Sequence, residues 1–183
     1  TLTNTNPVVA KEGAGYKVII TSAGNDSGIT FTINGAIVGQ LTEQGQVPNP
    51  NNPEVLAGGN AGAVTSAYFY SRVDSIVISA AAAGDGVSVG TTGDLALPRC
   101  RIKGFYVLSD AGAGSLKINR FSYTTSAYPT VAVESLLDIT TPAGATLTQF
   151  LSLPGQGILT GQQHNDFAVV TLATSTDYTL FCG

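Results

Sequence analysis

The sequence is poor in charge: Asp, Glu, Lys and Arg make up 11% of its 183 residues, against about a quarter in an average globular domain. Eight basic residues stand against twelve acidic ones, for a formal net charge of −4. Binding to nucleic acid is not expected, because neutralising phosphates requires clustered Lys and Arg side chains. Only Arg99, Arg101 and Lys103 come close together, and their alternation predicts one solvated strand face. A surface with few charges to desolvate is instead suited to packing against other protein.

Residues that carry chemistry are equally scarce. The chain has one histidine, two cysteines, no methionine and no tryptophan. One histidine and two distant cysteines cannot supply the clustered ligands of a zinc site, so we expect no metal and no other cofactor. No apolar run approaches the length of a membrane-spanning helix, and the N-terminus lacks the basic start and apolar core of a signal peptide. We therefore expect no membrane association.

The two cysteines, Cys100 and Cys182, leave two interpretations open. Both could be small buried thiols in strands, since free cysteine is often buried. Alternatively, a single bridge could join the first and last strands of a C-terminal domain.

Short apolar segments bounded by Gly, Ser, Asp or Asn recur at roughly ten-residue spacing, which is typical of antiparallel sandwiches and jelly rolls. In the clearest, Ile29, Phe31 and Ile33 alternate with threonines, which predicts a strand with one core face. Strands are expected at residues 16–21, 29–33, 73–79, 87–89, 100–108, 147–153, 157–159, 167–172 and 178–182. Asn34-Gly35 predicts a turn, residues 93–98 a short linker, and residues 131–139 either a strand or a helical turn.

This pattern predicts an all-β protein built of two small antiparallel β-sandwich or jelly-roll-like units. We place an N-terminal arm at residues 1–15, the first unit at residues 16–95 and the second at residues 96–183.

Two features of the first unit suggest contacts with a partner. Residues 44–60 hold three prolines and form a loop too long for an ordinary hairpin, and such loops often make contacts. The aromatic cluster at residues 68–70 reads as a strand edge with Phe69 inward and both tyrosines at a rim, where Tyr suits an interface. The candidate partner contacts are Val47, Pro48, Pro50, Pro53, Tyr68 and Tyr70.

Catalysis is not expected. His164 lies close to Asp166 in sequence, but the chain has no nucleophile elbow, and a single His in a polar loop is best interpreted as a solvated loop tip. The segment from Asn25 to Gly28 and the Gly-flanked Asp85 lack the acidic ladder and distal Glu of a calcium loop, and they predict turns instead. We therefore name no catalytic, cofactor-binding or metal-binding residue.

Several stretches resemble a pattern common in structural proteins of tailed bacteriophages. In the N-terminal half these are SAGNDSGITFTI at 22–33, Gly39, LTE at 41–43, AVTS at 63–66 followed by Tyr68 and Phe69, VDSI at 73–76 and VSVG at 87–90. The C-terminal half is similar to another recurring phage module, through TPAGA at 141–145, LPGQGI at 153–158 and the final FCG at 181–183. That module usually ends in an aromatic pair and glycine, and here Cys182 replaces one aromatic residue.

The resemblance implies a non-enzymatic β protein of the head or tail surface of a virion. The small size, the low charge and the lack of a coiled coil or long fibrous repeat favour a capsid decoration (cement) protein. Such a protein would be assembled in the host cytoplasm and would bind the major capsid protein lattice on the outer surface of the head, as a homo-oligomer for which a trimer is favoured. Two rival hypotheses are a tail or head-fibre adhesin that holds host polysaccharide through Tyr and Asn, and a hydrolase that uses His164.

Overall fold

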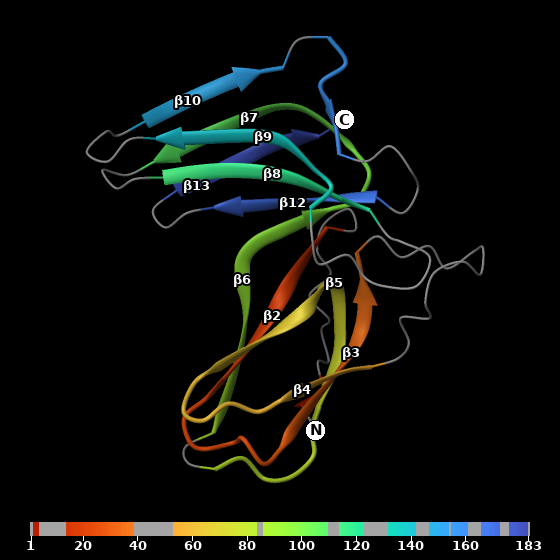
Figure 1. Ribbon diagram of the computed structural model, residues 1–183, viewed down its shortest axis with the longest axis vertical. Coiled ribbons are helices and arrows are strands. Elements are labelled where there is room, and N and C mark those ends of the chain that lie inside the picture. The colour runs from red at the N-terminus through yellow and green to blue at the C-terminus, as the bar shows by residue number, and fades with distance from the viewer. Residues whose placement is uncertain are drawn as a thin grey trace, which may run out of the picture. The chain divides into compact units, whose positions relative to one another are not determined.

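The computed structural model describes residues 2–3, 14–38, 53–83, 86–109, 114–122, 132–141, 147–153, 155–160, 166–172 and 176–182. Within these ranges every regular element is a β-strand (Figure 1). The prediction of an all-β, sandwich-like fold class is therefore confirmed. The chain divides into two compact units, Thr1–Leu95 and Ala96–Gly183.

The N-terminal unit is built around one long strand, β5 (Ala63–Ile78). Its first half pairs with β2 (Gly15–Ser22), and its second half pairs with β3 (Thr30–Ile37) and with the two-residue β1 (Leu2–Thr3). The edge strand β4 (Glu54–Ala57) lies on the far side of β3, and β6 (Val87–Leu97) lies on the far side of β2.

Alternating apolar residues of β2, β3 and β5 build the core of this unit, as the spacing of Ile29, Phe31 and Ile33 predicts for β3. The buried core cluster comprises Val18, Ile20, Phe31, Ile33, Tyr70 and Ile76.

Two local predictions for this unit are wrong. Asn34-Gly35 lies inside β3, where the register with β5 shifts, and does not form a turn. The backbone of Gly35 lies against the carbonyl of Arg72 so closely that a Cβ would overlap it, which explains the glycine without a turn. Residues 93–97 belong to β6, so a linker is not found there.

The C-terminal unit has two antiparallel sheets. One contains β12 (Asp166–Leu172), β8 (Gly114–Ser122) and β9 (Glu134–Thr141), in that order. In the other, β7 (Arg101–Ser109) is central: β13 (Thr176–Cys182) pairs along one edge, and β10 (Leu147–Ser152) and β11 (Ile158–Leu159) follow each other along the opposite edge.

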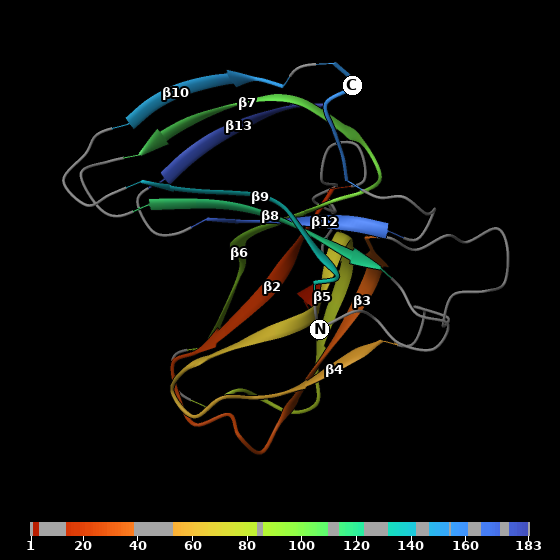
Figure 2. The same cartoon turned by 45° about the horizontal axis from the view of Figure 1, so that its top comes forward.

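Figure 2 shows the two sheets of this unit one above the other, with β10, β7 and β13 over β9, β8 and β12. Fully buried side chains from β7, β8 and β12 form its core: Ile102, Phe105, Leu116, Ile118, Phe167 and Val170. The ambiguous stretch at residues 131–139 is resolved as a strand from Glu134 onward.

Candidate functional site

The predicted contact residues are placed very differently. Val47, Pro48 and Pro50 lie outside the described residues. Pro53 is exposed and directly precedes β4. Tyr68 is half-buried against the core, and Tyr70 is buried, with 6% of its surface exposed.

The expected orientation of the aromatic cluster is wrong for Tyr70. Neighbouring residues of a strand point to opposite faces, and it is Tyr70 that belongs to the core cluster. Phe69 is also buried, and the Nζ of Lys17 lies 5.2 Å from the centre of its ring. A cation over an aromatic face is favourable, so Lys17 covers this ring while its charge stays near solvent.

Glu54, which has no place among the predicted contacts, connects β4 to the middle of β5. It is 9% exposed. Its Oε1 accepts a hydrogen bond from the amide of Ala67 at 2.6 Å, and its Oε2 accepts one from the hydroxyl of Tyr70 at 2.9 Å. Both carboxylate oxygens thus have a structural partner.

These bonds lie where β5 departs from regular pairing. Lys17 is opposite Phe69 and Ile19 is opposite Thr65, so residues 66–68 face Val18 alone. The hydroxyl of Ser66 accepts a hydrogen bond from the Val18 amide and donates one to the Tyr68 carbonyl, both at 2.8 Å. Side chains thereby satisfy backbone groups that the interrupted ladder leaves unpaired.

A second buried carboxylate, Asp26, organises the turn after β2. It is 1% exposed, and its Oδ1 accepts a hydrogen bond from the Ala83 amide at 2.7 Å. The neighbouring Asn25 Oδ1 accepts bonds from the amide and hydroxyl of Ser27, which is how Asn commonly closes a turn. These contacts favour the turn interpretation over a calcium loop.

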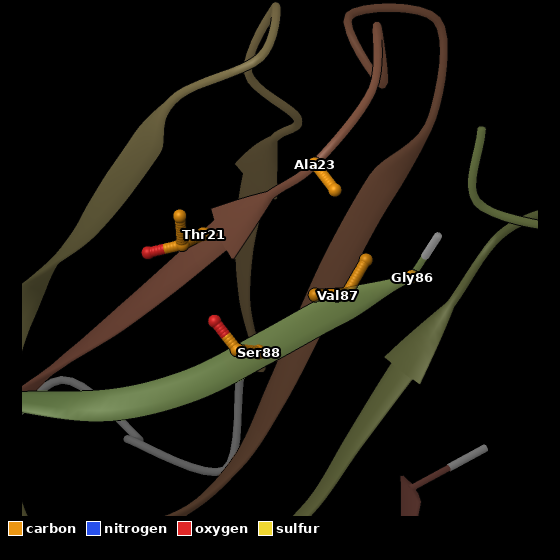
Figure 3. Close-up of a pocket in the computed structure, with 5 residues that line it drawn as sticks. All are labelled: Thr21, Ala23, Gly86, Val87 and Ser88. Carbon is orange, nitrogen blue, oxygen red and sulfur yellow. The ribbon is translucent and has the colours of Figure 1, made fainter. Parts of the chain in front are cut away.

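Beside this turn, a hollow of about 270 Å³ opens between the end of β2 and the start of β6 (Figure 3). It is lined by Thr21, Ala23, Gly86, Val87 and Ser88. The Ala23 amide donates a hydrogen bond to the Gly86 carbonyl at 3.2 Å, which joins the two segments there. Two hydroxyls and no ionisable group line the hollow, so it offers hydrogen bonds but no acid–base chemistry.

In the C-terminal unit, Arg120 of β8 lies between two carboxylates. Its Nη2 is 2.8 Å from Glu134 Oε2, and its Nη1 is 3.3 Å from Asp166 Oδ2. Asp166 is 1% exposed, whereas about half of the Glu134 side chain is in solvent. Arg120 neutralises Asp166, which gives this carboxylate a structural role. The neighbouring His164 lies outside the described residues.

Thr160, directly after β11, forms hydrogen bonds with residues at the start of the C-terminal unit. Its buried hydroxyl accepts a hydrogen bond from the Cys100 amide at 2.7 Å and lies 3.0 Å from the Pro98 carbonyl. The Sγ of Cys100, which is half-buried, lies 3.8 Å from the same oxygen.

The outward side chains carry no charge over residues 55–57 of β4, 30–34 of β3 and 75–79 at the end of β5; beyond them the same face continues to Ala36 and Arg72, which lie opposite each other. Val55, Thr32 and Val77 lie opposite one another across these strands. Val55 is 58% exposed and Val77 is 37% exposed. The other outward positions carry small or uncharged side chains: Ala57, Thr30, Asn34, Ser75 and Ser79. We call this surface the outer β face.

The nearest charges on β5 neutralise each other. Arg72 Nε donates to Asp74 Oδ1 at 2.7 Å, and this hydrogen bond, together with the attraction of the two charges, raises the pKa of Arg72 above its ordinary value. The pair therefore adds no net charge beside the outer β face.

Comparisons with protein-family models, with curated proteins and with solved structures found no match to the chain. Among the described residues, no group of three or more His, Cys, Asp or Glu side chains could hold a metal ion. No helix in that part of the chain is long and apolar enough to cross a membrane.

Proposed function

We propose that the chain is a structural protein of a tailed-bacteriophage virion, and that it decorates the outside of the capsid without catalysing a reaction. The observation that carries this proposal is the outer β face, where Val55 and Val77 stand exposed among uncharged side chains, beside the mutually neutralising pair Arg72 and Asp74. An uncharged surface with exposed β-branched residues loses little solvation energy when another protein covers it. The structural bonds of Glu54, Asp26 and Asp166 support a passive role.

The proposed partner is the lattice of the major capsid protein, to which the chain binds as a homo-oligomer, with a trimer favoured. A closed oligomer placed on a symmetry axis of the lattice engages several sites at once, which strengthens binding. A protein that binds only the assembled lattice stabilises it by mass action, by RT ln(1 + [L]/Kd) per site. The capsid would then resist heat or dilution better with the protein than without it.

An adhesin that binds host polysaccharide is the second candidate. The hydroxyl-lined hollow at Thr21 and Ser88 favours it, because hydroxyl groups can hydrogen-bond to sugars. An aromatic platform beside the hollow would strengthen this case, but the five lining residues include no aromatic.

The number of copies in the virion separates the two candidates. We expect quantitative mass spectrometry of purified virions to find hundreds of copies, in a fixed ratio to the major capsid protein. A handful of copies per particle would favour the adhesin. Failure to find the chain in virions would refute both roles.

A further inference from the structure

β4 is the edge strand of the N-terminal unit, and its outer edge is suited to strand pairing. Gly58, just past β4, donates its amide hydrogen bond to Ile29 at 2.9 Å. Backbone groups alternate along an antiparallel strand, so Glu54 and Leu56 point their amides and carbonyls toward β3. Val55 and Ala57 then direct theirs to the outer edge, where no backbone bond to them is seen within the described part of the chain.

The common defences against pairing are weak at this edge. Natural edge strands are often protected by charged side chains, bulges or proline. β4 pairs with β3 in unbroken register, and its one charged residue, Glu54, is turned into the unit and bound to Ala67 and Tyr70. The first defence met along the chain is Pro53, immediately before the strand.

We infer that this edge pairs with β4 of a second copy, antiparallel and with Val55 opposite Val55. Equivalent residues face each other across a twofold axis, so an uncharged residue suits the axis best, because a charge would face its own copy. In this register each Val55 amide donates to the Val55 carbonyl of the other copy. Each Ala57 amide donates to the other Pro53 carbonyl, and the pairing ends there because proline has no amide hydrogen.

Side-chain alternation agrees with this register. Residues that face each other in a ladder must share a face of the sheet, and Val55 opposite Val55 keeps the outer β faces of the two copies on the same side. The row Val77, Thr32 and Val55 then continues as Val55, Thr32 and Val77 of the second copy. A shift by one residue would place the inward, half-buried Leu56 opposite the exposed Val55 and break this continuity.

The contact is twofold, so it is separate from the threefold contact of the proposed trimer and would link copies of neighbouring trimers. It does not rest on the proposed capsid role, because the test uses the purified full chain alone. A failure of the twofold pairing therefore leaves the capsid proposal standing, and the reverse also holds.

Amide hydrogen exchange, followed by NMR as the protein is concentrated, tests the pairing directly. We expect the Val55 and Ala57 amides to exchange more slowly as the protein associates, while the Glu54 and Leu56 amides, which already face β3, stay unchanged. Protection that does not alternate in this way would refute the register.

Two matched variants, Val55→Lys and Val77→Lys, test where the contact lies. Both place a lysine on the outer β face, but Val77 is two strands from the edge, about 10 Å away. By sedimentation equilibrium we expect Val55→Lys to lower the association constant about fivefold or more, because like charges meet across the axis, and Val77→Lys to change it little. Unchanged amide spectra apart from the mutated site serve as the folding control.

Three results would overturn the inference. One is a wild-type chain that stays monomeric up to about 1 mM. Another is an equal loss of association in both variants, which would mean that the outer β faces pack on each other. The third is association with no protection of the Val55 amide, which would place the contact elsewhere.

Discussion

Glu54 holds an irregular part of β5 in place, and its removal should be costly. Glu54→Ala removes an acceptor of the Ala67 amide and of the Tyr70 hydroxyl. A buried donor that loses a charged acceptor costs about 1–3 kcal/mol, so we expect a loss of about 2–4 kcal/mol in the free energy of unfolding. Tyr70→Phe removes one of the two bonds and should cost about 1 kcal/mol.

The measurement is a urea titration followed by the amide NMR signals of residues 15–95, which reports on the N-terminal unit alone. Equal midpoints for Glu54→Ala and the wild type would show that the two bonds contribute nothing to stability. A midpoint for Tyr70→Phe below that of Glu54→Ala would contradict the shared role of the carboxylate.

In the C-terminal unit, the two ion pairs of Arg120 should contribute differently to the free energy of unfolding, because Asp166 is buried and Glu134 is half exposed. Arg120→Met removes the cation beside Asp166, and a buried ion that loses its partner costs about 3–5 kcal/mol. Glu134→Gln, on the exposed side of the same guanidinium, should cost less than about 1 kcal/mol. Urea unfolding followed by the signals of residues 96–183 measures both, and similar losses in the two variants would argue against the buried pair as the stabilising one.

Neither Glu54 nor Asp166 could be assigned from the sequence. Glu54 stands between Pro53 and a short apolar run, and nothing local indicates that it reaches residues 67 and 70, more than ten positions away. Asp166 borders an apolar strand, and the local sequence indicates only its neighbour His164, because its partner Arg120 is 46 positions away. Contacts of this kind depend on the tertiary pairing of strands, which local pattern does not contain.

Gly157 lets β11 approach β7 closely, and a side chain there should disturb the sheet. Its φ is +73°, and an added Cβ would overlap the carbonyl of Ile102. Gly155 also has a positive φ, +65°, but an added Cβ there would meet open space. Gly155→Ala should therefore cost about 1–2 kcal/mol from backbone strain alone, and Gly157→Ala about 1–3 kcal/mol more from the overlap.

Urea unfolding of the two alanine variants, read from the signals of residues 96–183, separates these contributions. The NMR shifts of Ile102 and Lys103 should move in Gly157→Ala and stay in place in Gly155→Ala. Equal losses in the two variants would mean that the sheet yields to the new side chain at no cost.

The sequence pattern located most strands because their alternation is local. The expected segments at 29–33, 147–153 and 167–172 overlap β3, β10 and β12 closely. It failed at β5, where a single strand of 16 residues pairs with two partners and shifts register with each. Irregular pairing interrupts the period of two, so the stretch reads as separate aromatic and apolar pieces.

The two units differ in how their charges are arranged. In the C-terminal unit, Arg101 Nη1 and Lys103 Nζ both approach the carbonyl of Gln156, at 3.3 and 3.4 Å, and not a carboxylate. In the N-terminal unit, the outer β face has no charge and Arg72 pairs with Asp74.

If the outer β face carries the proposed binding to capsids, salt should release little protein from the particles. Screening acts mainly on exposed charges, and at about molar salt the Debye length is about 3 Å. We expect pelleting of decorated particles to recover nearly the same amount of bound protein at low and at molar salt.

Arg101→Gln serves as the control and should bind like the wild type, because the guanidinium of Arg101 lies outside the outer β face. Release by salt, together with weak binding of Arg101→Gln, would instead place the interface on the strand face of Arg99, Arg101 and Lys103.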